Sequence, residues 1–272
     1  MEPLSTARVI TESRAVWDSI LEATEGLTEE QWSLPTPCPG WDVSDQLAHL
    51  IGIELMLLGE PTPEVDLSHL DYVTDPFKAS IESWIEVRRG MTGPEVRREF
   101  AEVMDRRAAQ LAGLSEAYLD EVDWSPVGQV PRREFYGSVR ILDCWLHEQD
   151  VRCTLDRPGG RFGAGELRTL ERAEIALPRV VGKGARAPEG ASVAFEVAGP
   201  QGGRLRLEVV DGRAQRLDGE EATATLAMDQ WAFLQRFAGR LSAEELLASG
   251  AVVISGDVDL GERVLDALAV MI

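Results

Sequence analysis

The chain has 272 residues, a length that favours two domains, and 44% of them are hydrophobic, enough for a sizeable core. Its formal net charge of -20, from 47 acidic and 27 basic residues, repels phosphate backbones and anionic lipid head groups, so nucleic acid and membrane surfaces are set aside as partners. The chain lacks an apolar run approaching the roughly 20 residues of a membrane span, and its N-terminus does not resemble a secretory signal. Three widely spaced cysteines predict free thiols in a reducing cytoplasm.

The first half of the sequence has helical periodicity. Apolar residues recur at helical spacing over residues 5–24, and Thr28 with Gln31 forms a capping-box pattern. After the proline-rich segment 32–41, Asp42 is predicted to cap a helix that runs to about residue 58. Apolar residues cover nearly its whole circumference, which predicts a buried helix. Further helices are expected at 77–89, from Pro94 to about 114, and at 134–155, with loops at 59–75 and 124–131.

The second half of the sequence has a different pattern of apolar and polar residues. A glycine-rich break at 156–166 predicts a boundary between a domain of residues 1–158 and one of residues 159–272. Apolar and polar residues alternate after this break, which predicts half-buried antiparallel strands. We expect strands at 193–197, 205–209, 215–217, 223–226 and 252–255, and helices at 166–181, 229–237, 243–248 and 260–270. We therefore expect a four-helix bundle followed by a smaller α+β domain.

The segment RILDCWLHEQDVR, residues 140–152, carries the most informative chemistry. Asp143 and His147 are four residues apart, so they lie on one face of the predicted helix, and Arg140 and Asp150 fall on the same face. This polar strip borders the apolar seam of the helix and is predicted to face the bundle interior. Two ligands at i and i+4 are a common way for a helix to hold a metal ion.

A third metal ligand must come from another helix. The sequence has three histidines; His69 lies in a predicted loop, whereas His49 lies in the middle of the buried helix. A bundle can bring His49 opposite Asp143 and His147, and three nitrogen and oxygen ligands with an open position are typical of catalytic zinc sites. The same spacing also fits a hydrogen-bonded core histidine and a charge-assisted Asp–His pair.

Cys38 stands in the segment TPCPGW and invites interpretation as a nucleophile. We predict that it is not one, because it has no histidine near it in sequence and free cysteines are commonly small buried hydrophobic residues.

Two motifs, WSLPTPCPGWDVSDQLAHL and LDCWLHEQDVR, resemble the family of mycothiol-dependent maleylpyruvate isomerases over residues 5–156. The resemblance implies a DinB-like metal-binding bundle, with His49 and His147 as the first and last metal ligands. Asp143 stands where that family has glutamate, one methylene longer. Asp150 is expected to orient His147 through a hydrogen bond.

The second half resembles the family's C-terminal domain, which is similar to sterol-carrier proteins; the segment GRLSAEELLASGAVVISGDVDLGERVLDAL carries this likeness. The resemblance implies that an arginine of this domain helps to bind substrate. Arg240 is the first candidate, with Arg236 and Arg204 as alternatives. A solvated surface arginine is the competing interpretation for each.

The implied function is that of a cytoplasmic enzyme with a divalent metal, zinc being expected, and mycothiol or a similar thiol as cofactor. The thiol would isomerise a small electrophile or be transferred to it, with Arg140 and Arg240 holding a carboxylate of substrate or cofactor. The alternative is a non-catalytic metal-binding module whose C-terminal domain binds a small apolar ligand, and a third interpretation is a bundle that has lost its metal. Fold resemblance alone does not choose among them.

Overall fold

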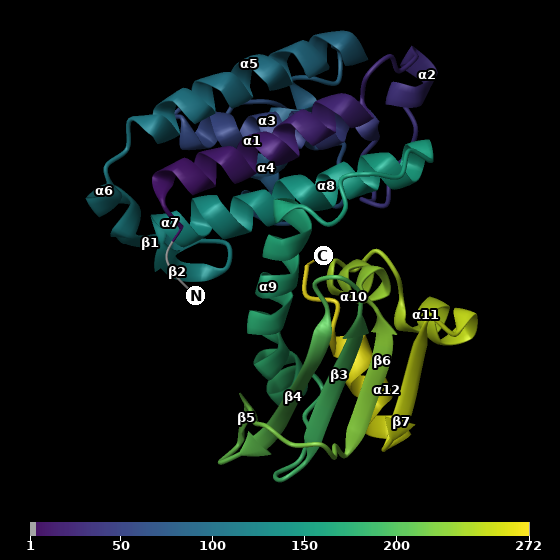
Figure 1. The fold of residues 1–272 in the computed structure, drawn as a ribbon. Helices are drawn as coiled ribbons and strands as arrows, with labels where there is room; N and C mark the ends of the chain where they lie inside the picture. Colours follow the sequence, from purple (N-terminus) through teal and green to yellow (C-terminus); the bar gives the residue numbers. More distant parts are fainter. Residues whose placement is uncertain (1–3, 272) are drawn as a thin grey trace. The chain divides into compact units, whose positions relative to one another are not determined.

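Four long helices dominate the N-terminal part of the computed structural model, which describes residues 4–271. In Figure 1, helix α1 lies beside α5 and α8, and α3 lies beside α4, α5 and α8. Leu47, Ile51 and Phe100 belong to the apolar core that these helices enclose. The predicted bundle is confirmed. Its long helices are α1 (Thr6–Ala23), α3 (Val43–Leu57), α5 (Gly93–Ala112) and α8 (Arg140–Leu155), and its shorter helices are α2 (Glu29–Trp32), α4 (Pro76–Glu86), α6 (Glu116–Asp120) and α7 (Arg132–Glu134).

Helix α3 begins as its sequence predicts. The Asp42 side chain accepts a hydrogen bond from the backbone N–H of Asp45, and the Asp45 side chain accepts one from Asp42 in return. Gly52 then allows α4 to approach closely, since a Cβ atom at this position would lie 2.3 Å from Cβ of Trp84. The buried helix is thus held at its start by a cap and at its middle by a glycine contact.

The segment before α8 differs from the predicted continuous helix. Instead of one helix from residue 134, a π-helical turn η1 (Phe135–Val139) connects α7 to α8. The wider turn changes the helical register, so Tyr136 is buried whereas Phe135 remains half-buried. The predicted loop at 124–131 is also wrong in part, because it contains most of a hairpin of β1 (Val122–Ser125) and β2 (Gly128–Pro131). Gly128, at φ 108°, turns this hairpin.

The chain divides into two compact units, Met1–Glu166 and Leu167–Ile272, within helix α9 (Ala164–Arg179). The second unit holds a five-stranded sheet in the order β5-β4-β3-β6-β7, accompanied by helices (Figure 1). Val193, Phe195 and Leu226 form part of its core. The elements after α9 are η2 (Val180–Gly184), β3 (Ser192–Ala198), β4 (Gly203–Val210), β5 (Arg213–Arg216), β6 (Ala224–Asp229), α10 (Gln230–Phe237), α11 (Ala243–Ser249), β7 (Val252–Gly256) and α12 (Val258–Ala267).

The pairing of these strands is partly as expected. Strand β4 is antiparallel to β3 and β5, and β7 is antiparallel to β6, but β6 runs parallel to β3, with Phe195 opposite Leu226. The expectation of antiparallel strands is therefore wrong for the central pair. Alternation of apolar and polar residues predicts a half-buried strand, but it does not predict whether the neighbouring strand runs parallel or antiparallel to it.

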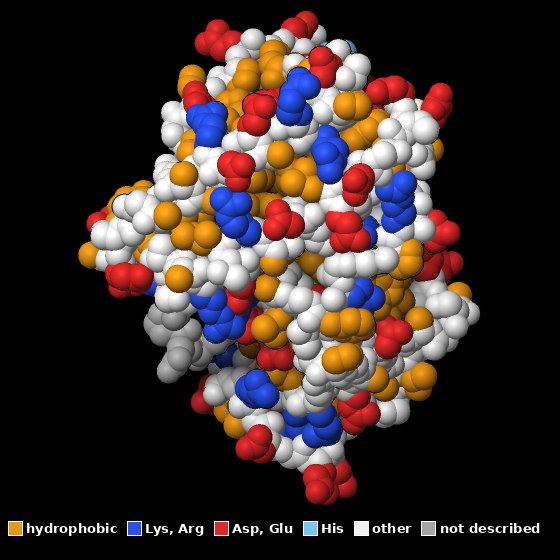
Figure 2. Space-filling view, turned by 45° about the horizontal axis from the view of Figure 1, so that its top comes forward, with side chains coloured by type: hydrophobic (Ala, Val, Ile, Leu, Met, Phe, Trp, Pro, Cys, Tyr) orange, Lys and Arg blue, Asp and Glu red, His pale blue; other side chains and the backbone are white. Residues whose placement is uncertain are grey.

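On the face in Figure 2, acidic and basic side chains are interspersed with exposed hydrophobic ones. Within residues 4–271, the helices are all too short or too polar to cross a lipid bilayer.

Candidate metal centre

Helices α3 and α8 bring three predicted ligands together. Oδ2 of Asp143 lies 3.4 Å from Nε2 of His49, and Oδ1 of Asp143 lies 3.6 Å from Nε2 of His147. The two imidazole rings are 4.6 Å apart at their centroids, and the three side chains offer ligand atoms that all lie within 4.8 Å of one another. His49 and His147 are buried, while the Asp143 side chain is 23% exposed.

These separations fit a metal ion. Bonds of about 2.1 Å to a tetrahedral zinc ion place neighbouring ligand atoms about 3.4 Å apart. Among the described residues, neither ring nitrogen of His49 makes a hydrogen bond, although both are buried; Nε2 has only the longer contact with Oδ2 of Asp143 at 3.4 Å. A buried polar atom without a partner is costly, and a coordinated ion at Nε2 would relieve this at one nitrogen. His49, Asp143 and His147 therefore suit a divalent cation of the zinc type.

The electrostatics of the three groups differ. Burial lowers the pKa of His49 to about 4, so this imidazole is neutral. Burial opposes the charged form of His147 as well, but the carboxylates of Asp143 and Asp150 hold the pKa of His147 well above its usual range. Burial would raise the pKa of Asp143, yet Arg140 and the two histidines hold it well below its usual range. The site thus contains a permanent carboxylate, one neutral imidazole and one imidazole that stays protonated without metal, so binding of a divalent cation would release the proton of His147.

Arg140 fixes the carboxylate of Asp143 through a hydrogen bond and an ion pair. Its Nη1 atom donates to Oδ2 of Asp143 at 2.5 Å, while Nε and Nη2 donate to Oε1 of Glu54 at 3.0 and 2.8 Å. Oε2 of Glu54 in turn accepts from Nε of Arg107 at 2.9 Å. These partners favour a role for Arg140 in fixing Asp143 over the predicted contact with a substrate carboxylate.

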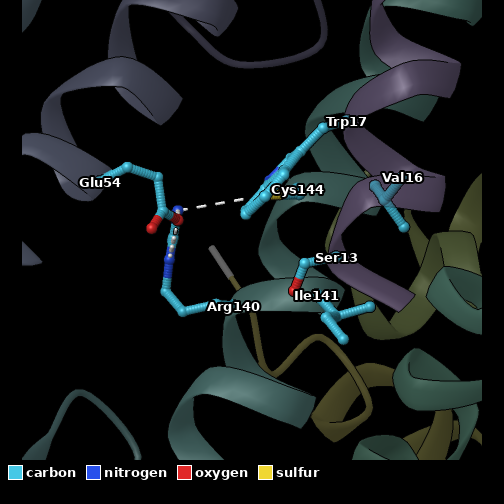
Figure 3. A pocket seen from close by; sticks show the side chains of 7 residues that line it. All are labelled: Ser13, Val16, Trp17, Glu54, Arg140, Ile141 and Cys144. Atoms are coloured by element: carbon cyan, nitrogen blue, oxygen red, sulfur yellow. Dashed lines mark hydrogen bonds and ion pairs between the residues drawn. The ribbon is translucent and has the colours of Figure 1, made fainter. Parts of the chain in front are cut away.

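Figure 3 shows Arg140 and Glu54 pointing toward one another beside a small cavity. The cavity has a volume of about 10 Å³, and its lining includes Trp17 and Cys144. This is room for about one water molecule, too little for a thiol or a substrate. Burial raises the pKa of the Cys144 thiol to about 12, so this cysteine stays protonated.

The other edge of the His147 ring meets a second set of polar groups. Nδ1 lies 2.5 Å from Oε1 of Gln46 and 3.6 Å from Oδ2 of Asp150. Asp150, predicted to orient His147, is therefore beside it, but Gln46 is the nearer partner. Trp41 covers both imidazoles, with ring centroids 5.0 Å from His49 and 5.8 Å from His147.

Cys38 also lies at this edge. Its Sγ atom donates to Oδ2 of Asp150 at 3.3 Å, and Cys38, His147 and Asp150 offer ligand atoms within 4.8 Å of one another. Cys38 has no histidine near it in sequence, but the fold brings His147 close to it, so that argument against a nucleophilic role is wrong. This proximity alone does not make Cys38 reactive, and the absence of a nucleophilic role for it stays a prediction.

The predicted arginines of the second unit have partners within that unit. Arg240 follows α10 and donates from Nη1 to the carbonyl oxygen of Ala238 at 3.0 Å. The guanidinium of Arg236 is buried and donates to the carbonyl oxygens of Leu265, Leu241 and Asp266. Those bonds give Arg236 a structural role near the end of α12, whereas half-buried Arg240 remains the better candidate for substrate contact.

Sequence reasoning missed Gln46 and Glu54. Both are polar residues in a helix that is apolar nearly all round, and both are fully buried. A polar side chain inside such a helix must find a partner, which is the signal that could have identified them. His69, set aside from the sequence, lies outside the cluster, with a side chain that is 53% exposed.

Comparison with known proteins agrees with this architecture. Residues 13–152, more than half of the chain, match the family model of the mycothiol maleylpyruvate isomerase N-terminal domain, and residues 179–269 match the SCP-2 sterol transfer family. Two crystal structures of mycothiol-dependent maleylpyruvate isomerase, one of them a histidine-to-alanine variant, share the fold. The variant has a TM-score of 0.61 at 17% identity and the other 0.57 at 15%, each with 93% of both chains covered. No curated protein sequence matches the chain significantly.

Fold and sequence together define a two-domain protein, with a DinB-like helical bundle and an SCP-2-like α+β domain. The chain belongs to the family of the mycothiol maleylpyruvate isomerase N-terminal domain, and the family predicted from its motifs is confirmed. At identities of 15% and 17%, the solved structures establish the shared fold alone.

Proposed function

We propose that this protein is a metal-dependent enzyme that uses a low-molecular-weight thiol of the mycothiol type to act on a small electrophile. The observation that carries the proposal is the convergence of His49, Asp143 and His147 at separations suited to one ion, with both nitrogens of His49 lacking a hydrogen-bond partner among the described residues. Membership of the isomerase family supports the choice of thiol.

The chemistry follows from the donor set. When bound, a divalent ion with an open position lowers the pKa of a thiol, and a thiol cofactor supplies a nucleophile that can add to an electrophile. If the thiol leaves again after rotation about the attacked bond, the outcome is cis–trans isomerisation; if it stays, the outcome is S-transfer. The maleylpyruvate isomerases named above make isomerisation the first reaction to test.

The residues of this chain prepare the site. His49 presents a neutral imidazole, Asp143 a carboxylate that offsets part of the ion's charge, and Arg140 keeps that carboxylate in place. Trp41 covers the imidazoles and limits access by water. Arg240 is proposed to hold a substrate carboxylate by paired hydrogen bonds.

A second candidate function rests on the C-terminal domain. Residues 179–269 match the SCP-2 sterol transfer family, which favours binding of a small apolar ligand. In that case the bundle would hold a metal without turnover, and a thiol would not alter any substrate.

Metal analysis tests the premise of both functions. Elemental analysis of the purified protein should find a divalent metal, at about one ion per chain. His49→Ala should lose it, while the matched change His69→Ala, at an exposed histidine outside the cluster, should retain it. Equal metal content in all three proteins would remove His49 from the site, and metal-free wild type after incubation with zinc would overturn the proposal.

Turnover separates the two functions. The metal-loaded protein is mixed with maleylpyruvate, with and without mycothiol, and the trans product is measured. Isomerisation that requires both the thiol and His49 supports the enzyme. Without product, S-transfer is tested by mass spectrometry of the thiol with other electrophiles, and failure of both reactions would favour the binding module.

A further inference from the structure

A chain of hydrogen bonds leads from the loop before α3 to His147. The loop is closed at Thr36, whose backbone N–H and Oγ1 both donate to the carbonyl oxygen of Trp41, at 3.0 and 2.9 Å. A backbone carbonyl can only accept, so the single hydroxyl hydrogen of Thr36 points at Trp41. The donor and acceptor of each later hydrogen bond in this series follow from the orientation of the Thr36 hydroxyl.

Thr36 sets the orientation of the Gln46 amide. With its hydrogen used, Oγ1 of Thr36 can only accept, and it does so from the backbone N–H of Cys38 at 3.3 Å and from Nε2 of Gln46 at 2.6 Å. The NH₂ group of Gln46 therefore faces Thr36, and its oxygen faces His147. Gln46 is completely buried, so water does not compete for these bonds.

The Gln46 amide then decides where His147 carries its hydrogen. Oε1 of Gln46 lies 2.5 Å from Nδ1 of His147, and an amide oxygen accepts only. Nδ1 must therefore carry a hydrogen in both the charged and the neutral ring. In the neutral ring this leaves a lone pair on Nε2, the nitrogen that faces Asp143 at 3.6 Å.

Gln46 is needed because the carboxylates alone do not distinguish the two nitrogens. Oδ1 of Asp143 lies 3.6 Å from Nε2, and Oδ2 of Asp150 lies 3.6 Å from Nδ1. Each carboxylate attracts a hydrogen to its own edge of the ring at the same distance. The shorter contact with Gln46 breaks this balance in favour of hydrogen on Nδ1.

We propose that Thr36 and Gln46 are positioning residues that fix the tautomer of His147, so that its Nε2 lone pair is available at the metal centre. The inference rests on the proposed function for its purpose, but the tautomer is a property of the protein without metal. His49 contrasts with His147, since its ring nitrogens lack such partners among the described residues.

Nuclear magnetic resonance of ¹⁵N-histidine-labelled, metal-free protein tests the tautomer directly. The chain has three histidines, and His49→Ala and His147→Ala assign their signals. In solution alkaline enough to leave the imidazoles neutral, wild-type His147 should carry its hydrogen on Nδ1. Thr36→Val removes the hydroxyl at nearly constant shape, and Gln46→Leu removes the amide. Both variants should show a substantial share of the Nε2–H tautomer.

Two matched variants control for shape and for Asp150. Thr36→Ser keeps the hydroxyl and should keep the wild-type tautomer, and Asp150→Asn should keep it as well because the Gln46 contact remains. Circular dichroism melts confirm that each variant is folded. An unchanged tautomer in either Thr36→Val or Gln46→Leu would overturn the proposal, as would a shift in Asp150→Asn.

Metal titration separates this inference from the proposed function. Competition of Zn²⁺ with a chromophoric chelator should show binding roughly 10-fold to 100-fold weaker in Gln46→Leu and Thr36→Val, the range for residues that orient a metal-binding histidine, and unchanged in Thr36→Ser. If wild type binds no zinc while the tautomer still depends on Gln46, the proposed function fails and the positioning role stands. If zinc binds equally well to all variants, the positioning role fails and the metal site stands.

Discussion

The interiors of the two units are built differently. In the first unit, charged side chains such as Glu54, Arg107 and Arg140 are buried and bonded to one another. In the second, the sheet encloses mainly apolar side chains, with Phe195 packed against Phe233 at a ring separation of 6.3 Å. Hydrogen bonds and ion pairs have direction, so the first interior can place the atoms of a site, whereas the second is specified by shape and volume.

The largest effect is expected at the carboxylate of the metal centre. Asp143→Asn removes a charge that two neutral imidazoles cannot replace, so zinc affinity should fall more than about 100-fold, beyond the range for residues that only orient a ligand. Chelator competition with the metal-free proteins measures it. Asp105→Asn, at a surface ion pair, is the matched control and should bind zinc as wild type does. Unchanged affinity in Asp143→Asn would make Asp150 the leading candidate for the third ligand.

The charged interior should be sensitive to the loss of one partner. Glu54→Gln leaves Arg107 and Arg140 buried beside a neutral amide, so the free energy of unfolding should fall by about 3–5 kcal/mol. Glu60→Gln breaks the exposed pair with Arg106 and should change it by at most about 1 kcal/mol. Urea unfolding compares the two, and equal effects would contradict the importance of burial.

Zinc affinity should distinguish a destabilising change in the first unit from one in the second. Glu54→Gln should also weaken zinc binding, because the carboxylate that fixes Arg140 beside Asp143 is lost. Phe195→Ala should destabilise the second unit by a similar amount, about 3–5 kcal/mol, through a cavity. The zinc affinity of Phe195→Ala should equal that of wild type. A lower affinity in this variant would show that the metal site depends on the apolar interior of the second unit.

Asp45 makes the charged interior depend on pH. Burial, followed by the charge of Asp42, raises the pKa of Asp45 from its ordinary 3.8 to about 6. The fold therefore favours the protonated carboxyl; this stabilisation is complete below about pH 3.8 and is lost as pH rises toward 6. Relative to its protonated state, the charged carboxylate then costs about 3 kcal/mol. Asp45→Asn should remove that loss.

Unfolding in urea at about pH 4 and pH 7 measures this contribution. Between the two conditions, the stability of wild type relative to Asp45→Asn should fall by roughly 2–3 kcal/mol. Asp71→Asn, at an exposed aspartate, serves as the control and should follow wild type. Nη2 of Arg89 lies 3.3 Å from Oδ2 of Asp45 and opposes the rise in its pKa. A constant difference between wild type and Asp45→Asn would mean that Arg89 keeps Asp45 charged throughout.

The smallest effect is expected at Cys38. Cys38→Ala removes one hydrogen bond to Asp150, worth about 1 kcal/mol or roughly fivefold in rate. Thiol-dependent turnover should therefore persist, and the exposed Cys153→Ala provides the matched change. If Cys38→Ala abolished turnover with metal content and fold intact, Cys38 would be a reactive nucleophile.

Local sequence patterns predicted much of the bundle. Helical spacing placed Asp143 and His147 on one face of α8, and the cap at Asp42 marked the beginning of α3. The π-helical turn at Phe135–Val139 was missed because its apolar residues also fit an ordinary helix. Residues 124–131, which hold most of the hairpin Val122–Pro131, have the sequence pattern of a loop, since strands of four residues are too short to show alternation.

The sequence by itself determined which side chains lie on one element, because neighbours three and four residues apart on a helix are placed by its geometry. The partners of those side chains were decided only by the tertiary structure. Gln46 and His147 are 101 residues apart, Arg140 and Glu54 are 86 apart, and Cys38 and Asp150 are 112 apart. The local periodicity of a helix says which face is buried and does not say which residues of another helix meet it. That choice depends on how α3, α8 and the loop before α3 pack together.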